Sequence, residues 1–332
     1  MKTRWKHRTK ILTAAAVVTC SSWGFSPHRE LHAVAITALP SPVFGFFKAH
    51  QHELMVRAVD ADKRKHGVKE EAERHYIDLD HYSDGISPCG WHEACERYSE
   101  DTLWSRGILP WSIERVYNQL VDEMSNCDAR DSSAASLSRV LRLSADLGHY
   151  IGDAHVPLHT TANYNGQFTG QIGIHALWET HVYETSRPYW TGQRIEAVYI
   201  SDIREWVWSR IMSSNANVEE VLRMEKAVRE RVGAPDVWGY RTRGRTLSLI
   251  PTPGFCEEYN DSLGGMIEER FYMAAEGIAS VWYSAWVDAG APDLEHELIK
   301  PKKRNLMNEL VHFLRARLQN QKEHVEEDLI SH

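Results

Sequence analysis

Apolar residues recur at intervals of three and four positions through most of the chain, a spacing that predicts amphipathic helices. In residues 134–153, five apolar positions fall on one helical stripe: Leu137, Val140, Leu141, Leu147 and Ile151. Further helices are predicted over residues 31–39, 44–59, 111–124, 202–212, 218–232 and 259–287, the last interrupted at Gly264 and Gly265. Long runs of alternating β-branched residues are absent from the sequence, so few strands are expected. The pattern therefore predicts an all-α fold with side chains projecting inward from several helices.

With 332 residues, the chain is long enough to bury one large core, and it contains no low-complexity linker or internal repeat. We predict a signal at residues 1–22, one compact multi-helix domain at 23–293 and a charged extension at 294–332. The extension has a basic cluster at 300–304 and then apolar positions on one helix face: Leu306, Leu310, Phe313, Leu314 and Leu318. That face either docks on the domain or a partner, or belongs to a peripheral helix.

The amino terminus has the layout of a secretory signal peptide. Five basic residues within positions 2–10 precede an apolar stretch at 11–18, and small residues follow at 20–22. The apolar stretch is shorter than the roughly 20 residues needed to span a bilayer, so no transmembrane anchor is expected. Lipid attachment at Cys20 is less favoured, because the residues before it are not small. Cleavage after Ser22 predicts a secreted or periplasmic protein whose first residue is Trp23.

Imidazole and carboxylate groups, which bind zinc through nitrogen and oxygen, are concentrated in residues 149–179. His149, Asp153 and His159 lie in one short run, and His175 and Glu179 follow it. The members of each pair, His149 with Asp153 and His175 with Glu179, are four positions apart. On a helix this spacing places both side chains on one face, close enough to share a metal ion.

Pro157 lacks an amide donor and is expected to end the first of these helices, so that His159 can turn back from a loop. The same spacing also fits a solvated polar face, because His149 and Asp153 lie roughly opposite the apolar stripe. The number of candidate ligands within this short segment favours the metal site.

Additional candidate ligands extend this pattern toward the amino terminus. The order Trp23-x4-His28, Asp60, His75, His149-x3-Asp153-x5-His159 and His175-x3-Glu179 resembles the zinc-dependent phospholipase C superfamily. That superfamily also contains the secreted single-strand nucleases of fungi and plants. The resemblance covers most of the chain, from Trp23 to about Asp288, and implies an all-α domain with a trinuclear zinc cleft.

The resemblance implies three metal positions: one held by the Trp23 amine and carbonyl with His28 and Asp153; one by Asp60, His75, His149 and Asp153; and one by His159, His175 and Glu179. Asp153 would bridge the first two ions. Asp62 lies close enough in the sequence to compete with Asp60 as a ligand.

The implied reaction is hydrolysis of a phosphate ester. Metal ions neutralise the charge of a phosphodiester and lower the pKa of bound water to about 7. A carboxylate such as Asp60 can position or deprotonate the attacking water. Lys63 falls where the nucleases place a phosphate-binding Arg, and Lys63 and Asn163 are the candidate substrate contacts. Asp78 and Asp80 are further candidates for orienting the ligand rings, as is Asn163.

Three features favour a phospholipase C-like phosphodiesterase over a nuclease. The last ligand is Glu179, as in the bacterial phospholipases, and the segment from Thr160 to Gln167 lacks the Gly-Gly-Asn of the nuclease base pocket. The chain has 38 basic and 46 acidic residues, and removal of the signal leaves 33 against 46, a net charge of −13. Nucleic-acid binding depends heavily on basic residues, so we expect a small phosphodiester or phospholipid headgroup as substrate. A single-strand nuclease and a non-catalytic zinc- or phosphate-binding surface protein remain the alternatives.

The positions of the cysteines and tryptophans indicate little about the function. After signal cleavage, four cysteines remain, which permits two disulfides in three pairings, and Cys89 with Cys95 is the favoured pair. The residues Trp190, Trp206 and Trp208 are expected to pack in the core, with the lining of a substrate cleft as the alternative.

Overall fold

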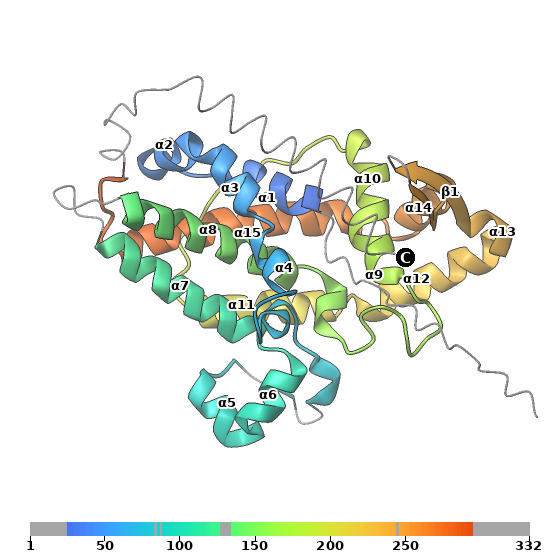
Figure 1. The fold of residues 1–332 in the computed structure, drawn as a ribbon, viewed down its shortest axis with the longest axis horizontal. Helices are drawn as coiled ribbons and strands as arrows, with labels where there is room; N and C mark the ends of the chain where they lie inside the picture. Colours follow the sequence, from blue (N-terminus) through green and yellow to red (C-terminus); the bar gives the residue numbers. More distant parts are fainter. Residues whose placement is uncertain (1–24, 83–84, 87, 127–133, 244–245, 295–332) are drawn as a thin grey trace, which may run out of the picture.

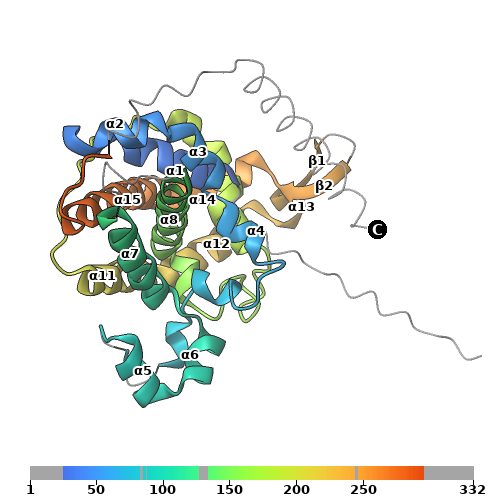
Figure 2. The same ribbon diagram turned by 60° about the vertical axis from the view of Figure 1, so that its left-hand side comes forward.

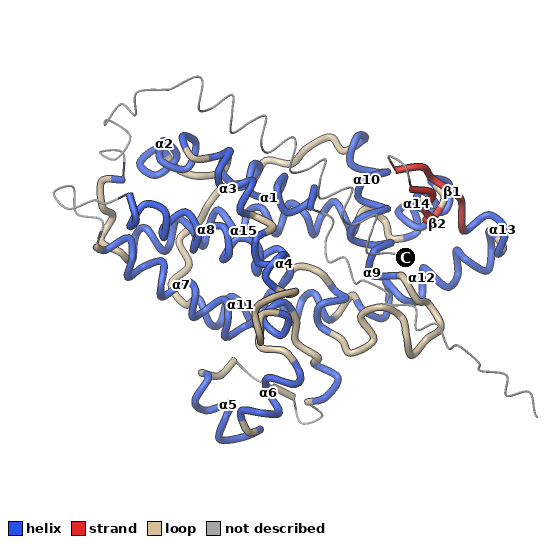
Figure 3. The backbone as a smooth tube through the Cα atoms, viewed as in Figure 1, coloured by secondary structure: helices blue, strands red, loops and turns tan. Residues whose placement is uncertain are grey.

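The computed structural model describes residues 25–294 except 83–84, 87, 127–133 and 244–245. The predicted signal, Trp23, Cys127 and nearly all of the predicted extension lie outside these ranges. The described chain is mostly helical, which confirms the predicted all-α class at this coarse level. Figure 3 shows one two-stranded hairpin among these helices, at one end of the molecule.

The amino-terminal half contains these helices and short 3₁₀ turns: α1 (Phe25–Thr37), α2 (Ser41–Ala49), α3 (Gln51–Arg57), α4 (Asp60–Arg64), η1 (Ala72–His75), η2 (Leu79–His81), α5 (Trp91–Tyr98), α6 (Glu100–Arg106), α7 (Leu109–Ser125) and α8 (Ala134–Ala154). The rest contains η3 (Pro157–Thr160), α9 (Ile174–Ala176), the π-helix η4 (Leu177–Val182), α10 (Tyr183–Ser186), η5 (Arg187–Tyr189), α11 (Ile203–Asn215), α12 (Val218–Val232), α13 (Ala234–Val237), β1 (Trp238–Arg243), β2 (Thr246–Pro251), α14 (Pro253–Ser262) and α15 (Met266–Asp288).

Helix α8 lies at the centre of the bundle. It packs against α1, α3, α7, α11 and α15 (Figure 1), and Figure 2 shows it between α1, α7 and α15. Its carboxyl-terminal half is buried on every side, so the polar residues His149 and Asp153 are as inaccessible as the apolar Leu147 and Ile151. The alternative of a solvated polar face is therefore wrong, because neighbouring elements cover both faces of the helix.

Most predicted helices agree closely with the structure, and residues 218–232 form α12 with the expected bounds. The predicted helix at 44–59 is divided into α2 and α3 at His50. The expected interruption at Gly264 and Gly265 separates α14 from α15, and both glycines have positive φ angles of 61° and 89°. Helix α8 ends at Ala154, before Pro157, as predicted.

The side chain of Trp208 is fully buried, whereas Trp190 and Trp206 are partly buried against the same core. Core packing is therefore their main role. The favoured disulfide does not form, since Cys89 and Cys95 are both free thiols. Within the described ranges, no helix combines the length and the apolar character needed to cross a bilayer.

Candidate metal centre

The fully buried carboxylate of Asp153 lies where the predicted ligands converge. Its Oδ2 is 2.8 Å from His75 Nδ1 and 3.3 Å from His149 Nε2. Its Oδ1 faces the other way and lies 3.5 Å from His28 Nε2 and 3.9 Å from His159 Nε2. One carboxylate thus contacts histidines from four separate segments of the chain.

Two groups of side chains that could hold a metal ion meet near Asp153. One comprises His28, His149 and Asp153, and the other comprises Asp62, His75 and His149. In the second group, Asp62 Oδ1 lies 3.5 Å from His149 Nε2 and 3.8 Å from His75 Nδ1. The imidazoles of His28 and His149 stack with ring centroids 3.9 Å apart.

The structure selects Asp62 rather than Asp60 for the second group. The two residues are two positions apart on α4, so their side chains point to nearly opposite sides of the helix. Asp62 is buried in the cluster, whereas the side chain of Asp60 is 37% exposed and pairs with Lys63 at 3.4 Å. Asp62 therefore lies in the position expected of Asp60. The sequence had left both residues open as ligands.

The third group comprises His159, His175 and Glu179, as predicted from the sequence. The two carboxylate oxygens of Glu179 lie 3.0 Å from His159 Nε2 and 3.0 Å from His175 Nε2. Glu179 belongs to the π-helix η4, and His175 precedes it on α9. The side chain of His175 is the most exposed of the eight in the three groups, at 12%, so this end of the cluster is nearest to solvent.

Two glycines of α8 allow α1 to approach the cluster. A Cβ atom at Gly152 would lie 3.1 Å from the His28 ring, and one at Gly148 would lie 2.5 Å from His32 Nε2. His28 and His32 are four positions apart on α1, as are the two glycines on α8. The glycines therefore form a shallow groove that receives both histidines, a feature that the ligand pattern alone did not indicate.

Backbone groups orient several of the ligand rings. His149 Nδ1 donates to the carbonyl of Ala58 at 2.8 Å, and His159 Nδ1 donates to the carbonyl of His75. The backbone amide of Ile77 donates in turn to the carbonyl of His159 at 2.9 Å, which joins the two segments. Each ring then directs Nε2 into the cluster, the arrangement expected for metal-binding histidines.

A buried ionic network supports the ring of His75. Arg64 contacts Glu71 and Asp146 at 3.0 Å each, and the Tyr150 hydroxyl donates to Glu71 Oε1 at 2.6 Å. The same Glu71 oxygen lies 3.8 Å from His75 Nε2. The carboxylates of Asp146 and Glu71 raise the pKa of the Arg64 guanidinium although burial opposes its charge.

The cation nearest to the cluster is Lys65, which the sequence reasoning did not single out. Its Nζ lies 2.8 Å from Asp62 Oδ1. The predicted phosphate contact, Lys63, instead points outward with Asp60 and has no contact to any of the three groups among the described residues. The helical position of Lys65 relative to Asp62, three residues later, was the available signal.

Asn163 stabilises a loop in the structure. Its Oδ1 accepts from the backbone amide of Phe168 at 2.8 Å, and its Nδ2 donates to Thr169 Oγ1 at 3.1 Å. Asp80 holds the same loop through Thr161 Oγ1 and the amide of Ala162, each at 2.7 Å. Both polar atoms of the Asn163 side chain are therefore engaged within the loop. Instead of the expected substrate contact, Asn163 stabilises the conformation of residues 161–173.

The ionisation states of His75 and Asp153 suit metal binding, whereas that of His149 opposes it. Burial and the charge of Lys65 lower the pKa of His75 to about 3, which keeps its imidazole neutral. Burial opposes ionisation of Asp153, but the charges of His149 and His159 hold its pKa well below its usual range. For His149, burial is outweighed by Asp153 and Asp62, which raise its pKa to about 10. A metal ion would compete with that proton.

The donor set fits a divalent metal ion. Several buried atoms of the cluster lack a hydrogen bond of normal geometry: Asp153 Oδ1, His159 Nε2 and both carboxylate oxygens of Glu179. A buried carboxylate that is not hydrogen-bonded is costly unless it is paired or coordinates a metal. The groups combine imidazole nitrogens with carboxylate oxygens and contain no thiolate.

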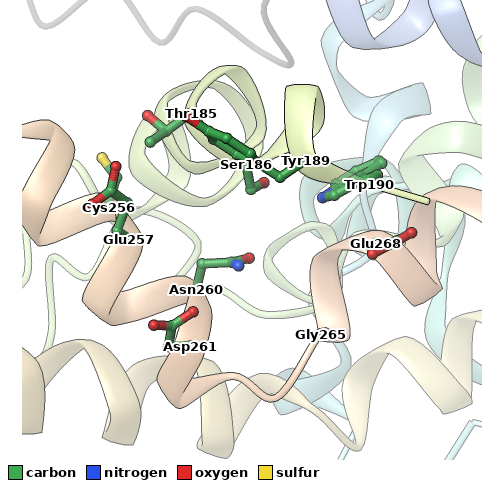
Figure 4. A pocket seen from close by; sticks show the side chains of 10 residues that line it. All are labelled: Thr185, Ser186, Tyr189, Trp190, Cys256, Glu257, Asn260, Asp261, Gly265 and Glu268. Atoms are coloured by element: carbon green, nitrogen blue, oxygen red, sulfur yellow. The ribbon is translucent and has the colours of Figure 1, made fainter. Parts of the chain in front are cut away.

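Figure 4 shows a separate pocket of about 430 Å³ between α10, α14 and the start of α15. Trp190 lies on one side of it, and the side chains of Asn260 and Glu268 lie along its wall. None of its lining residues belongs to the three groups, so this pocket is not part of the metal centre.

No protein-family model matches this sequence, and a search of curated proteins found no match either.

Proposed function

We propose that the protein is an exported zinc-dependent phosphodiesterase of the phospholipase C type, which hydrolyses a small phosphodiester or a phospholipid headgroup bond. The observation that carries the proposal is the convergence of eight His, Asp and Glu side chains, seven of them buried, around Asp153 and Glu179. The resemblance to the superfamily rests on the order and spacing of seven of these residues, together with Trp23 and with Asp60 where the structure has Asp62. Export rests on the predicted signal at residues 1–22.

In this proposal, His28 and Asp153 hold one ion, Asp62, His75, His149 and Asp153 a second, and His159, His175 and Glu179 a third. The Trp23 amine would complete the first set, as the resemblance implies. Bound zinc supplies Lewis acidity and lowers the pKa of water, which is the chemistry that phosphodiester hydrolysis requires.

Side chains of the protein would orient the attacking water and bind the substrate phosphate. Asp62 takes the positioning role first expected of Asp60: its buried carboxylate orients a water molecule by accepting a hydrogen bond from it. Although burial opposes ionisation, the charge of His149 holds the pKa of Asp62 well below its usual range, so the carboxylate is available as an acceptor. Lys65 stands next to it and can bind a phosphate oxygen as a point charge.

The charge of the chain supports a small substrate over a nucleic acid. The full sequence has a net charge of −8, and the loop of residues 161–173 beside His175 contains no charged residue. A polyanion would gain little from counterion release at such a surface. A substrate with a single phosphodiester needs only the few cationic groups of the metal centre and Lys65.

The test is hydrolysis of bis-nitrophenyl phosphate by the purified mature protein, together with its zinc content by mass spectrometry. We expect about three zinc ions per chain and hydrolysis that a chelator abolishes and zinc restores. His149→Ala should lose both metal and activity. The matched control is His92→Ala, in which the same substitution is made at a side chain that is 92% exposed.

Hydrolysis of phosphatidylcholine but not single-stranded DNA would support the phospholipase C-like function, and the opposite preference would assign the protein to the nucleases. A folded, fully metallated protein that hydrolyses neither substrate nor the model ester would contradict the enzyme proposal. It would then be a zinc-binding protein without turnover.

A further inference from the structure

His75 differs from the other histidines of the three groups in the nitrogen that it turns toward the cluster. Its Nδ1 lies 2.8 Å from Asp153 Oδ2 and 3.8 Å from Asp62 Oδ1. The other four histidines present Nε2 to a carboxylate of the cluster: His28, His149, His159 and His175. The Nε2 atom of His75 therefore lies on the outer side of its ring.

The outer nitrogen of His75 faces the carboxylate of Glu71. Glu71 Oε1 lies 3.8 Å from His75 Nε2, which is too long for a hydrogen bond but close for a buried charge. The two side chains are buried, and His75 Nε2 has no hydrogen-bond partner among the described residues. Within the same part of the chain, Glu71 supplies the one carboxylate that approaches this nitrogen.

The carboxylate of Glu71 is held in place by two neighbours. The Tyr150 hydroxyl donates to Glu71 Oε1 at 2.6 Å, and the Tyr150 ring packs edge-on against His75 with centroids 5.2 Å apart. Arg64 lies 3.0 Å from the same oxygen of Glu71 and 3.0 Å from Asp146. Because Arg64 divides its charge between two carboxylates, it does not fully neutralise Glu71.

These contacts connect the elements that supply the second metal position. Arg64 lies on α4 and Tyr150 on α8, while Glu71 is the residue immediately before η1. Both α4 and η1 pack on α8. The ligands of the second position come from the same three elements: Asp62, His75, His149 and Asp153. The ligands of the third group come from other elements.

The charge of Glu71 affects which nitrogen of His75 carries the proton. A neutral imidazole has one N–H group, and a metal ion at Nδ1 requires that this group be at Nε2. The Glu71 carboxylate attracts an N–H group at Nε2, whereas it repels a lone pair there. Glu71 therefore favours the tautomer that can bind a metal over the one in which Nδ1 donates to Asp153.

Backbone carbonyls perform the same task for two other rings of the cluster. His149 Nδ1 donates to the carbonyl of Ala58, and His159 Nδ1 donates to that of His75. A carbonyl cannot be removed by substitution and carries only a partial charge. Glu71 instead carries a full charge, and Glu71→Gln removes that charge while keeping the shape of the side chain.

We propose that Glu71 is a positioning residue for the second metal position and acts through His75. Its charge keeps the proton of His75 on Nε2, so that Nδ1 offers a lone pair beside Asp62 and Asp153. This inference deepens the proposed function and rests on it for the identity of the metal ion. Arg64 and Tyr150 hold the Glu71 carboxylate against the ring.

The test is the zinc affinity of Glu71→Gln, measured by titration of the metal-free protein against a fluorescent zinc chelator. We expect one of about three ions to bind roughly tenfold to a hundredfold more weakly, the usual effect of losing an outer partner of a metal-binding histidine. The other ions should bind as in the wild type, because their ligands do not contact Glu71.

The matched control is Asp146→Asn, which removes the same charge from the same network. Asp146 is the second carboxylate partner of Arg64, but it has no ion pair or hydrogen bond with a ligand ring among the described residues. Both variants should unfold at a lower urea concentration than the wild type, because each leaves Arg64 with one carboxylate fewer. Only Glu71→Gln should weaken zinc binding.

A second readout separates positioning from stability. Nitrogen-15 NMR of the histidine-labelled, metal-free protein distinguishes protonated from unprotonated ring nitrogens, and the signals lost in His75→Ala assign His75. The fraction of His75 with its proton on Nε2 should be lower in Glu71→Gln than in the wild type or Asp146→Asn. A purely structural role of Glu71 would leave this fraction unchanged.

Wild-type zinc affinity and hydrolysis in Glu71→Gln would overturn the role of Glu71 and leave the enzyme proposal standing. An equal loss of affinity in Asp146→Asn would also overturn it, because Glu71 would then act only through the stability of the network. A wild-type protein that binds zinc and hydrolyses no ester contradicts the enzyme proposal alone, and the selective loss in Glu71→Gln would still support the positioning role. Absence of zinc binding in the wild type would contradict both.

Discussion

At the scale of single residues, two carboxylates that are two positions apart have different environments. Asp62 is buried against His75, His149 and Lys65, whereas Asp60 is half-exposed beside Lys63. Only Asp62 lies in a candidate metal group. Asp62→Asn should therefore reduce zinc affinity and ester hydrolysis by roughly tenfold or more. Asp60→Asn, its matched control on the same helix, should change neither by more than about twofold.

Zinc titration with a fluorescent competitor would measure both affinities. Equal losses in the two variants, or a larger loss in Asp60→Asn, would return the ligand role to Asp60.

A second residue-scale prediction concerns Asp78. Burial, with repulsion from Asp80, raises the pKa of its carboxyl to about 6. Between pH 3.8 and 6, the unfolded chain has released this proton while the folded chain still holds it, so rising pH removes stability. Asp78→Asn should therefore be more stable than the wild type above pH 6, by about 1 kcal/mol after allowance for its partial exposure.

Below about pH 4 the two proteins should be equally stable, because the carboxyl is neutral in both states. Urea unfolding at several pH values would measure the difference. A difference that stays constant from pH 4 to pH 8 would show that the substitution acts through something other than this ionisation.

At the scale of elements, the approach of α1 to α8 depends on small residues. A Cβ atom at Gly148 would lie 2.5 Å from His32 Nε2, well inside van der Waals contact. Gly148→Ala gains up to about 1 kcal/mol of helix propensity, but the clash should lower the net free energy of unfolding by about 1–3 kcal/mol. It should also reduce zinc content, because His28 lies one turn from His32 on the displaced helix.

The matched control is Gly254→Ala in α14, where an added Cβ meets nothing within 4 Å. That variant should be as stable as the wild type or slightly more stable. If Gly148→Ala proved equally stable, the packing of α1 on α8 would not depend on the glycine groove.

At the scale of the whole molecule, the metal centre joins distant parts of the fold. The candidate ligands come from α1, α4, η1, α8, η3, α9 and η4, so an ion bound there would connect the amino-terminal helices to the central helix and to the segment after it. A metal ion that binds only the folded state stabilises it by about 2.7 kcal/mol when its concentration is a hundredfold above its dissociation constant. We expect zinc to raise the melting temperature by roughly 5–10 °C.

A chelator should reverse this shift, and His149→Ala should reduce it, because only the third group keeps all its candidate ligands, while His92→Ala retains it. Calorimetry with and without zinc would measure the three transitions. A melting temperature that does not respond to zinc in the wild type would contradict metal binding at these groups.

Local patterns predicted most of the helices, because the three- and four-residue spacing of apolar positions depends only on near neighbours. The same local spacing identified His149 with Asp153 and His175 with Glu179, and the structure brings both pairs into metal groups. Gly264 and Gly265 indicated the break between α14 and α15, because glycine readily adopts the positive φ angles that end a helix. The break at His50 carried no comparable signal. The β1–β2 hairpin did carry one, because Tyr240, Leu247 and Leu249 alternate with polar residues on either side of Gly244, but these runs are short.

The sequence by itself determined the helical class, the central helix and the residue types available for a metal. The tertiary structure decided which of those residues meet: Asp62 in place of Asp60, Lys65 in place of Lys63, and Asn163 in a loop. The tertiary structure also decided that the loop of residues 161–173 and the β1–β2 hairpin expose apolar side chains. Gly173 of this loop lies next to Trp238 of the hairpin. The reason is that helical periodicity fixes which side chains share a face, whereas packing between distant segments fixes which face is covered and by what.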